Sequence, residues 1–147
     1  MAEKLFEDVD ELFQEKPRWS SDIKTVGLEI PEFLKKIEDK KTVESPTFQL
    51  PGAAFYIKVA PGSEFTRVEL VNGSKKAQTA SVTFLEGSGA QCSLKMQEIK
   101  VNHCLGFSQF LSHEKFKTWA KKHGDVFKLK AVVTLHQKAT GEGWIRY

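Results

Sequence analysis

The chain has 147 residues, of which 40% are hydrophobic and 28% charged, a composition that fits one folded domain and excludes global disorder. Its 22 Lys and Arg residues against 19 Asp and Glu leave a net charge of only +3, spread along the sequence. Nucleic-acid-binding domains usually concentrate a larger basic excess, so this class is disfavoured. No run approaches the roughly 18 apolar residues of a membrane span.

The two cysteines, Cys92 and Cys104, lie in a chain whose first fifteen residues are acidic and amphipathic, unlike a signal peptide. A reducing compartment is therefore expected, the cytoplasm or alternatively the nucleus, with both thiols free. No cofactor is expected.

Residues 1–23 are predicted to form an amphipathic helix and a linker, with the helix ending at Pro17. Its apolar residues recur with the period of a helix and form one stripe: Leu5, Phe6, Val9, Leu12 and Phe13. About four turns are too short to be stable alone in water, so this stripe must pack on something. Leu5, Val9 and Leu12 could form a homo-oligomer contact, or the helix could fold back on its own domain.

Residues 24–137 are predicted to form a mostly β domain, an antiparallel sandwich of about seven or eight short strands, followed by a tail at 138–147. The expected strands cover residues 24–30, 47–50, 54–59, 65–71, 80–85, 92–101 and 127–135. Six apolar residues at two-residue spacing are expected on buried faces: Val68, Leu70, Val82, Phe84, Val132 and Leu135.

Three local patterns give sharper expectations. The Lys-rich stretch at 35–41 is interpreted as a solvated loop, and Asn72-Gly73 as the turn of a hairpin. Ser112 is a candidate N-cap for one helix before the last strand, ending at Gly124.

The order of motifs resembles the MATH, or TRAF-like, family over about residues 26–136. The resemblance is carried by five pieces in order: Leu28-x-Ile30-x-x-Phe33, Ser45-Pro46-Thr47-Phe48, Phe55-x-Ile57-x-Val59-x-Pro61, Gly106-Phe107-Ser108-Gln109-Phe110-Leu111 with the helix after it, and an Asp125-led last strand. Leu28 and Phe55 stand where the family often has tryptophan.

The resemblance implies a non-enzymatic, adaptor-like module that binds an extended partner peptide in a groove on a sheet face. The matching groove positions are Phe65, Val82, Ile99, Lys100, His103, Cys104, Leu105 and Phe107. The alternative interpretation of Phe65, Val82 and Ile99 is core packing, and core packing is favoured for Phe107. Leu105 takes a position that is often aromatic in peptide-binding members. Lys100 and His103 would favour a Ser/Thr-rich or acidic partner. The alternative function is a structural or assembly role through the N-terminal helix.

No pattern typical of catalysis is present. The four histidines lack metal-ligand spacing, and no Gly-rich loop precedes a Lys-Ser/Thr pair. His103 and Cys104 are neighbours, but adjacent residues of a strand point to opposite faces, which disfavours a nucleophile–base contact. The sequence therefore predicts that the protein is not an enzyme and holds no metal.

Overall fold

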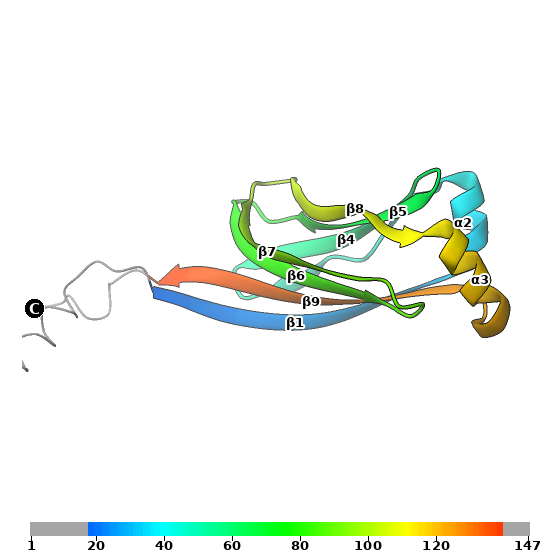
Figure 1. The fold of residues 1–147 in the computed structure, drawn as a ribbon. Coiled ribbons are helices and arrows are strands. Elements are labelled where there is room, and N and C mark those ends of the chain that lie inside the picture. The colour runs from blue at the N-terminus through cyan, green and yellow to red at the C-terminus, as the bar shows by residue number, and fades with distance from the viewer. Residues whose placement is uncertain (1–17, 140–147) are drawn as a thin grey trace, which may run out of the picture.

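The computed structural model describes residues 18–139, which form a mostly β, sandwich-like fold of two antiparallel sheets with two short helices (Figure 1). The first sheet has the order β1-β9-β6-β7 and the second β2-β4-β5-β8, with β3 also paired to β4. The elements are β1 (Arg18–Pro31), α2 (Phe33–Asp39), β2 (Val43–Glu44), β3 (Phe48–Leu50), β4 (Ala53–Pro61), β5 (Phe65–Asn72), β6 (Gln78–Glu86), β7 (Gln91–Ile99), β8 (Cys104–Ser112), α3 (His113–His123) and β9 (Val126–Ala139).

The core lies between the two sheets and follows directly from the alternation of side chains. In β4 the residues Phe55, Ile57 and Val59 are at most 1% exposed, and the residues between them are half-buried. Because successive side chains of a strand point to opposite faces, one face of β4 is the core face. The neighbouring strand β5 contributes Leu70 to the same cluster, and the facing sheet contributes Phe84 and Leu135.

Five of the six residues expected on buried faces are buried, and Val132 is the exception. Val132 stands between Ala131 and Val133, which are both fully buried in β9. Its side chain therefore points to the outer face of the first sheet, where it is half-buried. The expectation for Val132 was wrong because it lies an odd number of positions from Leu135.

The expected hairpin at Asn72-Gly73 does not form. β5 pairs with β4 and β8, whereas β6 pairs with β7 and β9, so the chain crosses from one sheet to the other after Asn72. The Asn72 side chain is fully buried in this crossing. Its Nδ2 donates to the carbonyl oxygens of Lys76 and Ile99 at 3.0 and 2.8 Å, and its Oδ1 accepts from the Ser74 amide at 2.9 Å.

Most of the Lys-rich stretch expected as a loop is helical, because α2 covers Phe33–Asp39. Phe33 and Ile37 are buried one turn apart, and Phe33 stacks on Phe127 with ring centroids 4.6 Å apart. Asp125 Oδ1 accepts from the Leu34 amide at 2.9 Å. The helix is held by these contacts with the start of β9, while its lysines lie on the side away from the core.

The helix expected after Ser112 is confirmed. Ser112 Oγ accepts from the Lys115 amide at 3.4 Å, and α3 ends at Gly124, whose amide donates to the Ala120 carbonyl. Both helices lie at the same end of the two sheets (Figure 1).

Two expectations concern the chain ends. β1 begins at Arg18, earlier than the expected start of the first strand, and β9 continues to Ala139. The predicted N-terminal helix, with Leu5, Val9 and Leu12, lies outside the described residues, as does most of the expected tail.

Candidate functional site

The structure divides the expected groove residues into separate groups. Val82 lies in β6 of the first sheet, where it is 2% exposed and faces the core. Phe65 begins β5 and stands opposite Ser112, whereas Val71 near the other end of β5 stands opposite Cys104. Phe65 is therefore at the opposite end of the second sheet from the turn that carries Lys100 and His103.

The remaining residues gather around the turn between β7 and β8. Ile99 and Leu105 are buried in the core, while Lys100, His103, Cys104 and Phe107 are exposed. The exposed side chains follow one another along the turn and the free side of β8. This strand is the last in its sheet, so among the described residues no strand pairs with its outer side.

The turn is fixed to the end of β5 by backbone hydrogen bonds. The Asn72 amide donates to the His103 carbonyl, and the Asn102 amide donates to the Asn72 carbonyl, both at 3.0 Å. Asn102 has a φ of 62°, a left-handed conformation that asparagine tolerates better than most residues. Lys100 and His103 are therefore held at a defined place beside β8.

The outer face of the second sheet carries a cluster of polar side chains beside β8. Arg67 Nε lies 3.0 Å from Glu69 Oε1, and Cys104 Sγ donates to Glu69 Oε2. Lys58 stands opposite Glu69 on the neighbouring strand β4. Although it is a carboxylate, Glu69 is only 8% exposed, because its two oxygens are engaged by neighbours on two strands.

Gly106 makes room for this arrangement. It stands opposite Glu69, and a Cβ added at Gly106 would lie 2.6 Å from both Glu69 Cγ and the Val68 carbonyl oxygen. The backbone oxygen cannot move aside as a flexible side chain could. The glycine therefore allows the Glu69 side chain to lie flat across the edge of the sheet toward Cys104.

Cys104 is a hydrogen-bond donor in this cluster. Burial, the hydrogen bond to Glu69 and the charge of that carboxylate together raise the pKa of Cys104 from 9.0 to about 11, against smaller opposing effects of Arg67 and Lys58. The thiol therefore stays protonated at neutral pH. This protonation state disfavours a nucleophilic role.

The edge itself is irregular and partly apolar. Val68 is paired with Phe107, and Thr66 is paired with Leu111. Between these two pairs, three residues of β8 stand opposite the single residue Arg67 of β5, which makes a bulge in β8. Phe107, directly before the bulge, is 42% exposed, a large value for an aromatic side chain on the core side of its strand. Bulges commonly redirect side chains at sheet edges, and here the bulge leaves Phe107 accessible.

We call the exposed residues of this region the β8 edge site: Lys100, His103, Cys104 and Phe107, with Lys58, Arg67 and Glu69 on the adjoining outer face. Lys58, Arg67 and Glu69 are not among the site residues predicted from the sequence. The alternation of apolar and charged residues in β4 and β5 indicates that these three side chains face outward. That they lie near Cys104 follows only from the pairing of β4 with β5 and of β5 with β8.

The described residues contain no group of three His, Cys, Asp or Glu side chains arranged to hold a metal ion. No helix between residues 18 and 139 is both long enough and apolar enough to span a membrane. No protein-family model and no curated protein sequence matches the chain.

Proposed function

We propose that the protein is a non-enzymatic, adaptor-like recognition module of the MATH type, which binds an extended partner segment at the β8 edge site. The observation that carries this proposal is the exposed edge of β8, with an accessible aromatic side chain beside fixed polar groups. An extended peptide can add to such an edge through main-chain hydrogen bonds, while alternate side chains reach pockets on either side.

The family assignment is supported by the order of the motifs and by the helix α3 directly before the closing strand β9. The two-sheet fold agrees with what the resemblance implies. Leu105 is 6% exposed, so its side chain fills the core, and Phe107 offers the apolar contact instead.

The charges around the site indicate the kind of partner. Arg67 is engaged by Glu69, whereas Lys100 and His103 are exposed and make no side-chain hydrogen bond or ion pair among the described residues. These two groups can donate to hydroxyl or carboxylate oxygens of a ligand. A Ser/Thr-rich or acidic segment therefore fits this end of the site.

Peptide selection tests the proposal. Peptides selected from a displayed random library on the immobilised full chain are expected to be extended and Ser/Thr-rich or acidic. Phe107→Ser should weaken their binding at least tenfold by fluorescence anisotropy, and Lys100→Glu should weaken the acidic peptides most.

The matched control is Ile23→Ser, which removes an exposed apolar side chain from β1, the edge strand of the other sheet. This variant should bind the peptides as tightly as the unmodified chain. Unchanged affinity in a folded Phe107→Ser variant would show that the β8 edge does not bind them.

A further inference from the structure

The outer face of the first sheet is unusual for a protein with so many charged residues. Two neighbouring rows of paired residues across β1, β9 and β6 contain no charged side chain. These rows are Ile23–Thr134–Ser81 and Thr25–Val132–Thr83. We call these six residues the uncharged face. The outer face of the second sheet differs, since it carries Lys58, Arg67 and Glu69.

The uncharged face has apolar atoms in contact with solvent. Ile23 is 68% exposed, the largest value for a large hydrophobic residue in the part of the chain that the structure describes, and Val132 is only half-buried. A single exposed apolar residue needs no explanation, but a flat face without charges is suited to being covered.

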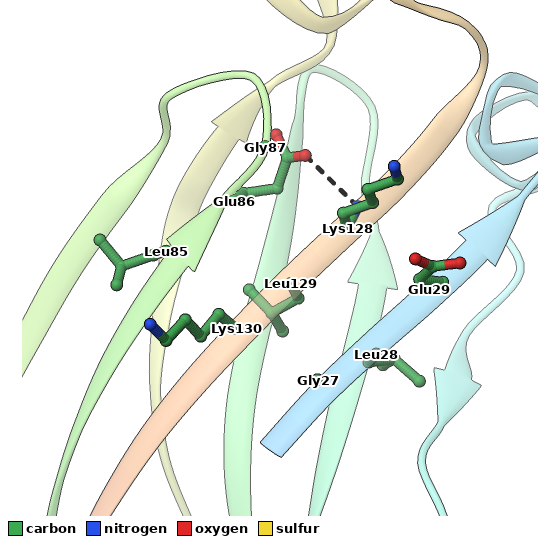
Figure 2. A pocket seen from close by; sticks show the side chains of 9 residues that line it. All are labelled: Gly27, Leu28, Glu29, Leu85, Glu86, Gly87, Lys128, Leu129 and Lys130. Carbon is green, nitrogen blue, oxygen red and sulfur yellow. Dashed lines mark hydrogen bonds between the residues drawn. The ribbon is translucent and has the colours of Figure 1, made fainter. Parts of the chain in front are cut away.

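A hollow of about 340 Å³ adjoins the uncharged face on the side toward the helices. Figure 2 shows Leu85 and Lys130 on neighbouring strands, with Gly27 on the next strand contributing no side chain. A Cβ on Gly27 would meet nothing nearer than the Leu129 carbonyl oxygen at 3.9 Å, so the space above it is open. Lys128 and Lys130 give this end of the face a positive charge, against Glu29 as its one exposed acid.

The segment that precedes β1 in the sequence has the complementary composition. Residues 1–17 precede β1 and contain the five apolar residues of the predicted helical stripe. They also carry six acidic residues against two lysines. The acidic residues Glu3, Glu7 and Asp8 lie in the half of the segment that is farther from Arg18.

The length of the segment matches the length of the face. Gly27 lies nine residues after Arg18, roughly 30 Å along a strand. A helix over residues 3–13 would span about 16 Å, and the four residues before Arg18, which must also reverse the chain, add at most about 13 Å. A helix turning back along β1 would therefore bring the acidic residues to Lys128 and Lys130.

We propose that residues 3–13 dock as an amphipathic helix on the uncharged face of their own chain, antiparallel to β1. The apolar stripe covers Ile23 and Val132, and its first residues, Leu5 and Phe6, fill the hollow above Gly27. The acidic side chains lie toward Lys128 and Lys130. This inference is independent of the β8 edge site, which belongs to the other sheet.

A double-mutant cycle on the full chain tests the docking. Phe6→Ser and Ile23→Lys should each raise the unfolding equilibrium constant several-fold, as measured by urea denaturation. In the double variant, the second substitution should add little to the destabilisation caused by the first, because both changes remove the same contact. The non-additivity is expected to be on the order of tenfold in the equilibrium constant. Additive effects, or an Ile23→Lys variant as stable as the unmodified chain, would overturn the proposal.

A control on the other sheet and a dilution series complete the test. Ala60→Lys places the same charge on the outer face of β4, where Ala60 is half-buried, and should show no coupling with Phe6→Ser. Coupling between Phe6 and Ile23 should be the same at all protein concentrations, and light scattering should give a monomer. Coupling that disappears on dilution would mean that the segment binds a second copy, which also overturns the proposal.

Discussion

At the scale of single residues, Glu69 is one of two buried carboxylates among the described residues, the other being Glu86. A buried charge is costly unless it is paired and hydrogen-bonded, and Glu69 meets both conditions through Arg67 and Cys104. Its neighbour Gly106 supplies the space. The result is a polar cluster with a defined geometry beside a free strand edge.

This geometry leads to a prediction about thiol reactivity. Because the pKa of Cys104 is about 11 rather than 9.0, its thiolate fraction at pH 7.5 should be on the order of 100-fold below that of an ordinary thiol. In a Cys92→Ser background, alkylation of Cys104 should therefore be slow although the residue is exposed. Glu69→Gln removes the negative charge and should accelerate the reaction, as followed by mass spectrometry.

The matched control is Glu44→Gln, which removes a carboxylate from β2 that makes no contact with the thiol. It should leave the alkylation rate unchanged. If Glu69→Gln also leaves the rate unchanged, then Glu69 does not govern the reactivity of Cys104.

At the scale of elements, most strands and the longer helix α3 could be predicted from local patterns, whereas β2, β8 and the shorter helix α2 could not. The strand β8 lacks a regular alternation of buried and exposed residues, because four exposed residues follow one another in it. The alternation in β4 and β6 directly marks one buried face, and Ser112 and Gly124 delimit α3. In α2 only Phe33 and Ile37 are buried, which is too short a pattern to distinguish from a loop. Its stability depends on Phe127, which is distant in sequence.

The candidate site shows the same limit. Alternation could have placed Lys58, Arg67 and Glu69 on an outer face. The contact between Glu69 and Cys104 depends on the pairing of β5 with β8. The exposure of Phe107 depends on a bulge in the same pairing. Strand pairing is non-local, so local periodicity does not determine it.

The junction of α3 with β5 gives a prediction of pH dependence. His113 is 4% exposed, its Nε2 lies 2.8 Å from Thr66 Oγ1, and its Nδ1 has no hydrogen-bond partner with normal geometry. Burial lowers the pKa of His113 from 6.5, and the charge of Lys117 acts in the same direction. The unfolded chain therefore binds a proton at a higher pH than the folded chain does.

This difference between the folded and unfolded chain determines how stability changes with pH. The contribution of His113 to stability is complete above about pH 6.5 and is lost as the pH falls below that value. Urea midpoints measured between pH 7.5 and 5 should decrease, and His113→Gln should make this decrease smaller. Equal slopes for the unmodified chain and His113→Gln would contradict the assignment.

At the scale of the whole molecule, the two sheets are joined through buried polar contacts as well as through the apolar core. Asn72 ends β5 in the second sheet, and its side chain donates to the carbonyl oxygen of Ile99, which ends β7 in the first sheet. The same side chain also holds the crossing segment through Lys76 and Ser74. Asn72 therefore fixes how the sheets meet near the β7–β8 turn and supports the position of Lys100 and His103.

The last prediction concerns this junction. Asn72→Ala leaves three backbone groups without their partner, the buried Ile99 carbonyl and the part-buried Lys76 carbonyl and Ser74 amide. Each such loss costs about 1–3 kcal/mol when water cannot replace the partner. Partial entry of water should reduce the total, so we expect the free energy of unfolding to fall by roughly 2–4 kcal/mol in urea denaturation. Thr118→Ala, which removes an exposed side-chain hydrogen bond to the Glu114 carbonyl in α3, should change it by less than about 0.5 kcal/mol. Because Asn72 lies beside the turn, Asn72→Ala should also increase amide hydrogen exchange at residues 100–103 more than at the distant turn of residues 87–90. Equal exchange at the two turns would show that Asn72 stabilises the molecule without fixing this end of the β8 edge site.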